Sequence, residues 1–160
     1  MSVNYGDLNV QFTGDASEVL RSVNEFLAKN IPSINLAQNL ILNFTIKELI
    51  EKFHDYIRLT PEGPRVWLQN RKLSDKEIVA LQLVGERIAS ESSGPSNRLV
   101  TLARMQESTS LSPKSLSSRL SELTKSGHVV RESKGQEKGF RISTQGIEWL
   151  SKVLEREYPN

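Results

Sequence analysis

The sequence predicts an α+β protein in which a small N-terminal α/β unit is followed by a domain of helices and one β-hairpin. Three observations support this class. Strand-like and helix-like apolar patterns mix in the first seventy residues, capped amphipathic helices dominate the rest, and two short β-type runs flank a polar, glycine-bounded tract near residue 136. A length of 160 residues allows one ordinary domain or two small ones. We expect two, residues 1–72 and residues 73–160, joined by the polar linker 70–72.

The expected N-terminal domain begins with a β-type run at residues 8–12 and an amphipathic helix over 16–29. The pattern of residues 34–44 is compatible with either a short helix or a strand, and we expect a short helix that runs into a strand. Thr45 and Glu48 have the spacing of a capping box before the next amphipathic helix. The sequence therefore predicts short elements of both kinds here.

The rest of this domain indicates a hairpin and no chemistry. The turn Pro61–Glu62–Gly63–Pro64 separates two β-type runs, at residues 56–60 and 65–69. His54 has no carboxylate or serine partner in the sequence pattern, and no residue set supplies a nucleophile, a base and a stabiliser. This domain can dimerise, bind a ligand or dock a partner, and the sequence does not choose among these roles. We expect a protein that is not an enzyme.

The chain contains no cysteine and two histidines. Disulfides, thiolate zinc sites and cysteine nucleophiles are therefore excluded, and we expect neither a metal site nor a cofactor. No apolar run approaches the length of a membrane span, and nothing at the start is typical of a signal peptide. The expected location is the cytoplasm, without a membrane partner.

Helices dominate the expected C-terminal domain. Ser74 and Glu77 form a capping box at the start of a long first helix. A second helix is expected around residues 99–106, joined to the next by a longer connection than a short turn. The last helix, 144–158, has a second apolar strip, formed by Trp149 and Val153, which can pack on the N-terminal domain or form a dimer contact.

The stretch from Leu111 to Arg141 organises this domain. Ser112 is a good N-cap, Pro113 stands at the first helical position, and Gly127 can end the helix in the left-handed conformation. Leucines follow at helical spacing on one side, at positions 116, 120 and 123. Two β-type runs at 128–132 and 140–143 then flank a charged tract. A helix with a sharp stop and a charged hairpin is typical of a recognition helix followed by a wing.

Small hydroxyl and cationic residues lie opposite the leucines of this helix. At 100° per residue the opposite face carries Lys114, Ser117, Ser118, Ser121 and Lys125. Serine is a modest helix former, so its repetition on an exposed face has no evident stability reason. Short hydroxyl side chains allow close approach to a DNA groove and can bond base edges or phosphates. A solvated serine-rich face without a partner is the alternative.

The same stretch resembles the recognition-helix-to-wing segment of winged-helix regulators of the MarR, HxlR and PadR type. The resemblance rests on Leu111–Lys114, Leu116, Leu120, Leu123, Gly127, Val129 and Arg131, and on Thr144–Gly146 at the start of the last helix. It covers roughly Leu73 to Tyr158 and identifies a superfamily. It implies a winged helix-turn-helix domain in an archaeal or bacterial transcription regulator.

The charge distribution agrees with a DNA-binding role. The net charge is only +2, and residues 1–72 balance to zero. Residues 98–141 hold nine Lys or Arg against four Asp or Glu, an excess of five positive charges. A local basic excess attracts phosphates. Because the excess is moderate, we expect two copies of the domain to be needed.

We therefore expect a winged-helix, double-stranded-DNA-binding transcription regulator that acts as a homodimer. The alternatives are a winged-helix protein-interaction module in a larger assembly and a non-specific chromatin-type binder. A small-molecule effector is compatible with the sequence, but no pattern supports one. The expected DNA-binding residues are Lys114, Ser115, Ser117, Ser118, Arg119, Ser121, Lys125, Arg131, Lys134, Gln136, Lys138 and Arg141.

Overall fold

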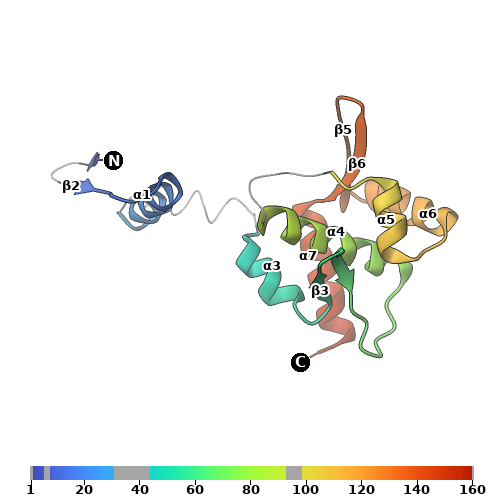
Figure 1. The fold of residues 1–160 in the computed structure, drawn as a ribbon. Helices are drawn as coiled ribbons and strands as arrows, with labels where there is room; N and C mark the ends of the chain where they lie inside the picture. Colours follow the sequence, from blue (N-terminus) through green and yellow to red (C-terminus); the bar gives the residue numbers. More distant parts are fainter. Residues whose placement is uncertain (1, 6–7, 31–43, 93–98, 160) are drawn as a thin grey trace. The chain divides into compact units, whose positions relative to one another are not determined.

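The computed structural model describes residues 2–5, 8–30, 44–92 and 99–159 (Figure 1). Its contacts divide the chain into an N-terminal unit, Met1–Asn43, and a C-terminal unit, Phe44–Asn160. The division falls before residue 44 and not between residues 72 and 73, where we expected it. Residues 44–72 belong to the C-terminal unit because they pack on its central helix. Within the described residues the fold is mixed α and β, as expected, with three two-stranded antiparallel sheets.

The N-terminal unit contains a hairpin and one helix. Strand β1 (Ser2–Tyr5) pairs with β2 (Leu8–Gln11), and α1 (Ala16–Asn30) follows. The carboxylate of Asp15 caps α1 by accepting hydrogen bonds from the backbone N–H groups of Ser17 and Glu18, at 2.9 and 3.0 Å. The strand and helix predicted at 8–12 and 16–29 are confirmed, and β1 was not foreseen. The segment left open at 34–43 lies outside the described residues.

The C-terminal unit begins with α3 (Ile46–Phe53), which the predicted capping box starts. The backbone N–H of Thr45 donates to the Glu48 carboxylate at 2.7 Å, and the N–H of Glu48 donates to the Thr45 hydroxyl at 3.3 Å. The inner side of α3 buries Leu49 and Phe53 completely. Local hydrogen bonds and periodicity therefore account for this helix.

The predicted hairpin follows α3. Strand β3 (Ile57–Thr60) pairs with β4 (Gly63–Val66), and Arg58 is the cross-strand neighbour of Arg65. The second strand is shorter than the expected run at 65–69. It ends at Val66, after which Gln69 and Asn70 take left-handed backbone conformations, with φ of 40° and 66°. These conformations are incompatible with a strand.

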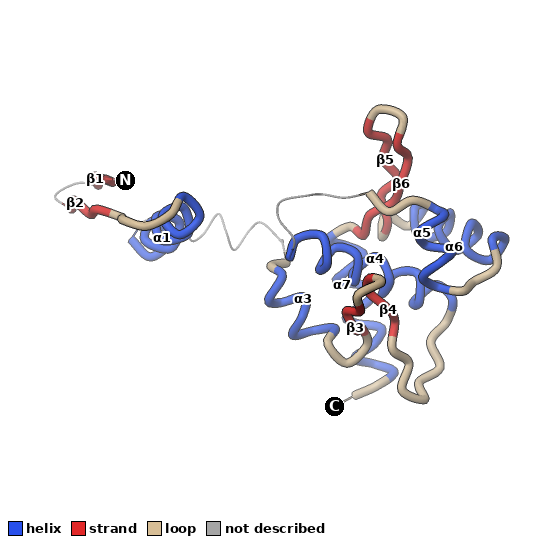
Figure 2. The backbone as a smooth tube through the Cα atoms, viewed as in Figure 1, coloured by secondary structure: helices blue, strands red, loops and turns tan. Residues whose placement is uncertain are grey.

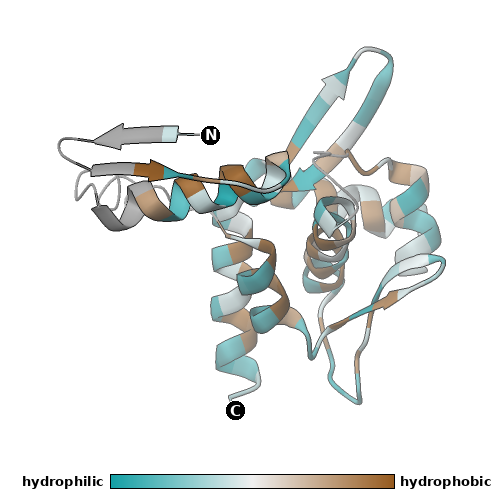
Figure 3. Ribbon diagram, turned by 60° about the vertical axis from the view of Figure 1, so that its left-hand side comes forward, coloured by the Kyte–Doolittle hydropathy of each residue, from teal (hydrophilic) through white to brown (hydrophobic). Residues whose placement is uncertain are grey.

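The central element is α4 (Asp75–Ser92), which contacts α3, both strands of the β3–β4 hairpin, and the helices that follow. Figure 2 shows it in the middle of the C-terminal unit. Nine of its residues are buried. Apolar residues, brown in Figure 3, gather where the helices of this unit meet. Residues 44–72 thus share the core of α4 with the helices that follow.

The remaining elements are α5 (Leu102–Thr109), α6 (Pro113–Lys125), β5 (Val129–Lys134), β6 (Glu137–Ile142) and α7 (Thr144–Glu157). Helices, hairpin and last helix follow the expected order. Before α5, the backbone of Val100 exchanges two hydrogen bonds of 2.9 Å with Phe140 in β6.

The connection between α5 and α6 differs from the expectation. We expected a helix around 99–106 and a long connection, and α5 instead begins three residues later. Val100 is extended because it pairs with Phe140, and Thr101 caps the helix through a 3.2 Å bond from the N–H of Arg104. The turn is therefore short. It spans residues 110–112 and starts with Ser110 at φ 57°.

No helix among the described residues is both long and apolar enough to cross a membrane.

Candidate nucleic-acid interface

The orientation of α6 is set by its leucines. Leu116, Leu120 and Leu123 are at most 2% exposed, so this side of the helix faces the core. The hydroxyl of Ser112 accepts the backbone N–H of Ser115 at 3.2 Å and caps the helix. The predicted cap and apolar stripe of α6 are thus confirmed, and the core side determines which residues face outward.

The opposite side of α6 is uncovered. All five residues predicted to share it are exposed, and we call them the α6 outer face: Lys114, Ser117, Ser118, Ser121 and Lys125. The face thus presents three hydroxyls between two ammonium groups. These groups can donate hydrogen bonds to phosphate oxygens and to acceptors on base edges.

A cleft of about 270 Å³ continues this face toward the β5–β6 hairpin. Its walls come from the start of α5, from α6 and from the hairpin. They consist of Leu102, Ser117, Leu120, Ser121, Thr124, Lys125, Arg131 and Phe140. The guanidinium of Arg131 lies over the Phe140 ring, 5.9 Å from its centre. Cationic groups therefore stand at the edge of a partly apolar floor.

Sequence reasoning missed four members of this cleft: Leu102, Thr124 and Phe140, and also Leu120, which was expected only in the core. Leu102 is 41% exposed because Met105 takes the buried position of α5. Phe140 could have been found from the hairpin register, since it stands opposite Arg131. No sequence signal pointed to Leu102.

The hairpin tip is charged and open. Its turn contains Gly135 at φ 60°, where the left-handed backbone favours glycine. The side chains of Lys134, Gln136 and Lys138 are exposed, as is that of Arg131 nearer the base. The structure thus leaves four predicted hairpin residues accessible.

The structure gives three other predicted DNA-binding residues partners within the chain. The hydroxyl of Ser115 donates to the Asp75 carboxylate of α4 at 2.6 Å. Arg119 pairs with Glu122 at 3.0 Å, and Arg141 contacts Glu132 through two nitrogens, at 2.6 and 2.9 Å. Each of these residues therefore has a partner within the chain, although the buried Nε of Arg119 has none among the described residues. The two arginines contribute less net positive charge than their number suggests.

The two glutamates in these pairs stay ionised. A hydrogen bond from Lys76 of α4, 3.0 Å away, lowers the pKa of Glu122, and Arg119 adds to the effect. The hydrogen bond from Arg141 lowers the pKa of Glu132 in the same way. Each carboxylate neutralises a nearby cation, so Lys114, Lys125, Arg131, Lys134 and Lys138 remain as the cations of the interface.

Trp149 of α7 is partly buried and packs against the core. Its ring stacks on the imidazole of His128 with centres 4.6 Å apart and planes 13° from parallel. Burial, together with the charge of Lys76, lowers the pKa of His128. The contact lies within the C-terminal unit, an arrangement that neither expected role of the second apolar strip included.

Among the described residues, no three histidine, aspartate or glutamate side chains are grouped to hold a metal ion. The arrangement of hydroxyl, ammonium and guanidinium groups is suited to binding an anionic polymer.

Comparison of the chain with models of known protein families, with curated proteins and with solved structures gave no match.

Proposed function

We propose that this protein is a cytoplasmic transcription regulator that binds double-stranded DNA through a winged helix-turn-helix and acts as a homodimer. In this proposal α6 is the recognition helix and the β5–β6 hairpin is the wing. One observation carries the proposal: the α6 outer face is exposed and continues through the cleft to the cationic hairpin.

The α6 outer face supplies the contacts to bases. The major groove is about 12 Å wide and admits one α-helix. Serine side chains at positions 117, 118 and 121 are short, so the helix backbone can approach the base edges closely. Lys114 can reach a guanine or a phosphate from the first turn of the helix.

The cations around this face supply the contacts to phosphates. Lys125 and Arg131 border the cleft, and Lys134 and Lys138 stand on the hairpin. With Lys114 they offer up to five phosphate partners among the described residues. Each neutralised phosphate contributes a slope of roughly −0.9 to the dependence of log affinity on log salt. Such a modest number per protomer supports a homodimer, in which two interfaces bind one site.

In vitro selection from a random duplex library tests the proposal directly. We expect enrichment of a motif with twofold symmetry, and binding at least about 10³-fold tighter to the selected duplex than to a scrambled one. Equal affinity for every duplex would instead indicate a non-specific chromatin-type binder. A failure to bind any duplex at low salt would overturn the proposal and favour a protein-interaction module.

Lys134→Ala tests the role given to the hairpin. Because Lys134 is assigned a phosphate, the variant should bind the selected and the scrambled duplex more weakly by the same factor, with a salt slope shallower by about one. Lys47→Ala is the matched control, since it removes the same charge from an exposed site on α3. Fluorescence anisotropy over a salt series measures both, and unequal losses on the two duplexes would contradict a phosphate contact.

A further inference from the structure

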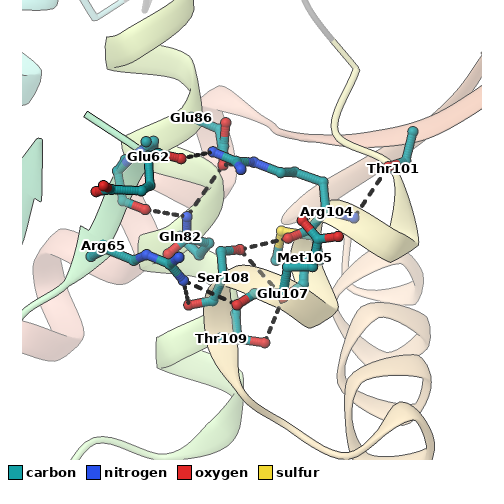
Figure 4. Close-up of polar contacts among 12 residues, drawn as sticks. Glu62, Arg65, Gln82, Glu86, Thr101, Arg104, Met105, Glu107, Ser108 and Thr109 are labelled. Atoms are coloured by element: carbon teal, nitrogen blue, oxygen red, sulfur yellow. Dashed lines mark hydrogen bonds and ion pairs between the residues drawn. The ribbon is translucent and has the colours of Figure 1, made fainter. Parts of the chain in front are cut away.

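The β3–β4 hairpin contacts α5 through two arginines, one from each side (Figure 4). From β4, a terminal nitrogen of Arg65 donates to the backbone carbonyls of Glu107 and Ser108, at 3.0 and 3.1 Å. From α5, Arg104 donates to the backbone carbonyl of Glu62 at 3.0 Å. The hairpin and α5 are therefore connected by bonds to backbone atoms, which do not move independently of the elements that carry them.

Arg65 contacts α5 where its backbone needs a partner. The last four carbonyls of a helix have no intrahelical donor, and they carry the negative end of the helix dipole. Glu107 and Ser108 belong to the final turn of α5, which ends at Thr109. A guanidinium bound to two of these carbonyls satisfies them and places a positive charge at the favourable end of the helix.

The position of Arg65 is itself fixed by α4. The buried side-chain amide of Gln82 donates to the Pro64 carbonyl at 2.8 Å. Gly85 lies directly under the hairpin, because a Cβ at this position would stand 2.9 Å from the Cβ of Pro64. The carboxylate of Glu86 holds Arg104 at 3.1 Å. The hairpin is therefore bonded both to the central helix α4 and to the end of α5, and it fixes the position of one relative to the other.

The end of α5 is also the start of the turn that leads into α6. Ser110 takes a left-handed conformation directly after α5, and Ser112 already caps α6. A turn of three residues gives little freedom between the helices. A shift of the last turn of α5 thus displaces the first turn of α6, which carries Lys114 of the outer face and leads directly into Ser117.

We propose that Arg65 is a positioning residue for the α6 outer face and that the β3–β4 hairpin is a brace that holds the α5–α6 turn. This inference rests on the proposed DNA-binding function, and it assigns a role to residues that precede the helix-turn-helix. Among the described residues, the Arg65 guanidinium bonds to carbonyls of α5 and not to residues of the outer face. It acts through the carbonyls of α5, and its loss loosens the turn without removing a phosphate partner.

Arg65→Ala tests the proposal, with Arg58→Ala as the matched control. Arg58 is the cross-strand neighbour of Arg65 and carries the same charge, but among the described residues its guanidinium bonds to the carbonyls of His54 and Ile57 in its own segment and not to α5. Hydrogen exchange of the full chain, read over residues 108–118 and over α7, gives the first measurement. The affinities for the selected and the scrambled duplex give the second.

We expect exchange over residues 108–118 to be about tenfold faster in Arg65→Ala, a factor typical of losing a hydrogen bond to a charged group. Exchange in α7 should stay as in the natural chain. Binding to the selected duplex should weaken about tenfold while binding to the scrambled duplex stays within a factor of two, because base contacts need a fixed α6 and phosphate contacts need only charge. Arg58→Ala should change neither measurement.

Arg65→Lys keeps the charge beside the carbonyls but loses the planar geometry of the guanidinium. We therefore expect its exchange rate over residues 108–118 to lie between the rates of the natural chain and of Arg65→Ala. It also serves as the test variant if Arg65→Ala does not fold. Unchanged exchange over residues 108–118 in the folded variants would overturn the brace, whatever the DNA result. A chain that binds no duplex but shows the faster exchange would instead overturn the proposed function and leave the brace intact as a structural role.

Discussion

Gly146 lies where the first turn of α7 packs against the backbone of His128. A Cβ at this position would stand 2.0 Å from the His128 carbonyl oxygen. That carbonyl cannot move aside, because it accepts bonds from the backbone N–H and the hydroxyl of Ser143, both at 3.0 Å. The glycine in the Thr144–Gly146 motif is therefore required by close packing.

Gly146→Ala should lower the free energy of unfolding by about 2 kcal/mol or more, the usual cost of overpacking a rigid site. Urea denaturation followed by circular dichroism measures the loss. Gly135→Ala is the comparison, because nothing lies within 4 Å of its added Cβ and only the left-handed backbone is disfavoured. Its cost should be about 1 kcal/mol. Equal losses in the two variants would argue against the proposed clash.

Glu132 and Arg141 give the hairpin a pH-dependent contact. Since the pKa of Glu132 is lowered below 4.5 by the hydrogen bond from Arg141, the pair stabilises the fold at higher pH. This contribution is lost as the pH falls through the lowered pKa. Glu132→Gln should therefore show a smaller drop in melting temperature between pH 5 and pH 3 than the natural chain. Glu137→Gln, an exposed position in the same hairpin, should keep the natural drop, and identical profiles for all three would refute the assignment.

At the scale of elements, two serines at α6 have different environments, one at the start of the helix and one on its outer face. Ser112 caps the helix and belongs to the turn, whereas Ser121 lies exposed on the outer face and lines the cleft. The two serines have the same side chain and are nine positions apart. They offer a matched pair in which one hydroxyl serves the backbone and the other is free for a partner.

Ser112→Ala should reduce the free energy of unfolding by about 1 kcal/mol, as expected for a lost N-cap. Ser121→Ala should leave it within about 0.5 kcal/mol, because the position is exposed on a helix surface. For DNA affinity we expect the opposite order of effects. Under the proposed function, Ser121→Ala weakens binding to the selected duplex more than Ser112→Ala does, measured by anisotropy. A Ser121→Ala variant with natural affinity and specificity would remove this residue from the interface.

At the scale of the molecule, the central helix α4 decides what forms one unit. It contacts α3 and the β3–β4 hairpin as well as α5, α6 and α7. The side chains of Leu49 and Phe53 reach this shared core and are fully buried. At the C-terminal end of α7, the hydroxyl of Tyr158 donates to the backbone carbonyl of Lys72 at 2.9 Å. Residues 44–72 thus complete the core of the helices that follow them.

A chain comprising residues 73–160 should therefore be much less stable than one comprising 44–160. Each fully buried side chain of the size of Leu49 or Phe53 contributes about 1.5–3 kcal/mol, so several kcal/mol are lost with residues 44–72. Urea denaturation and size-exclusion chromatography of the two fragments measure this. We expect a cooperative transition for 44–160, and an early transition or aggregation for 73–160. Equal midpoints would restore the boundary at residue 72.

The sequence by itself determined the local features: the caps at Thr45, Ser74 and Ser112, the leucine side of α6, and thus its outer face. These depend on hydrogen bonds within four residues and on helical periodicity, which a sequence displays directly. Only the tertiary structure decided that Ser115 donates to Asp75 of α4 and that Arg141 pairs with Glu132 in the hairpin. It also placed residues 44–72 on α4 and brought Leu102 to Phe140, because such contacts join segments far apart in the chain and depend on how the elements pack.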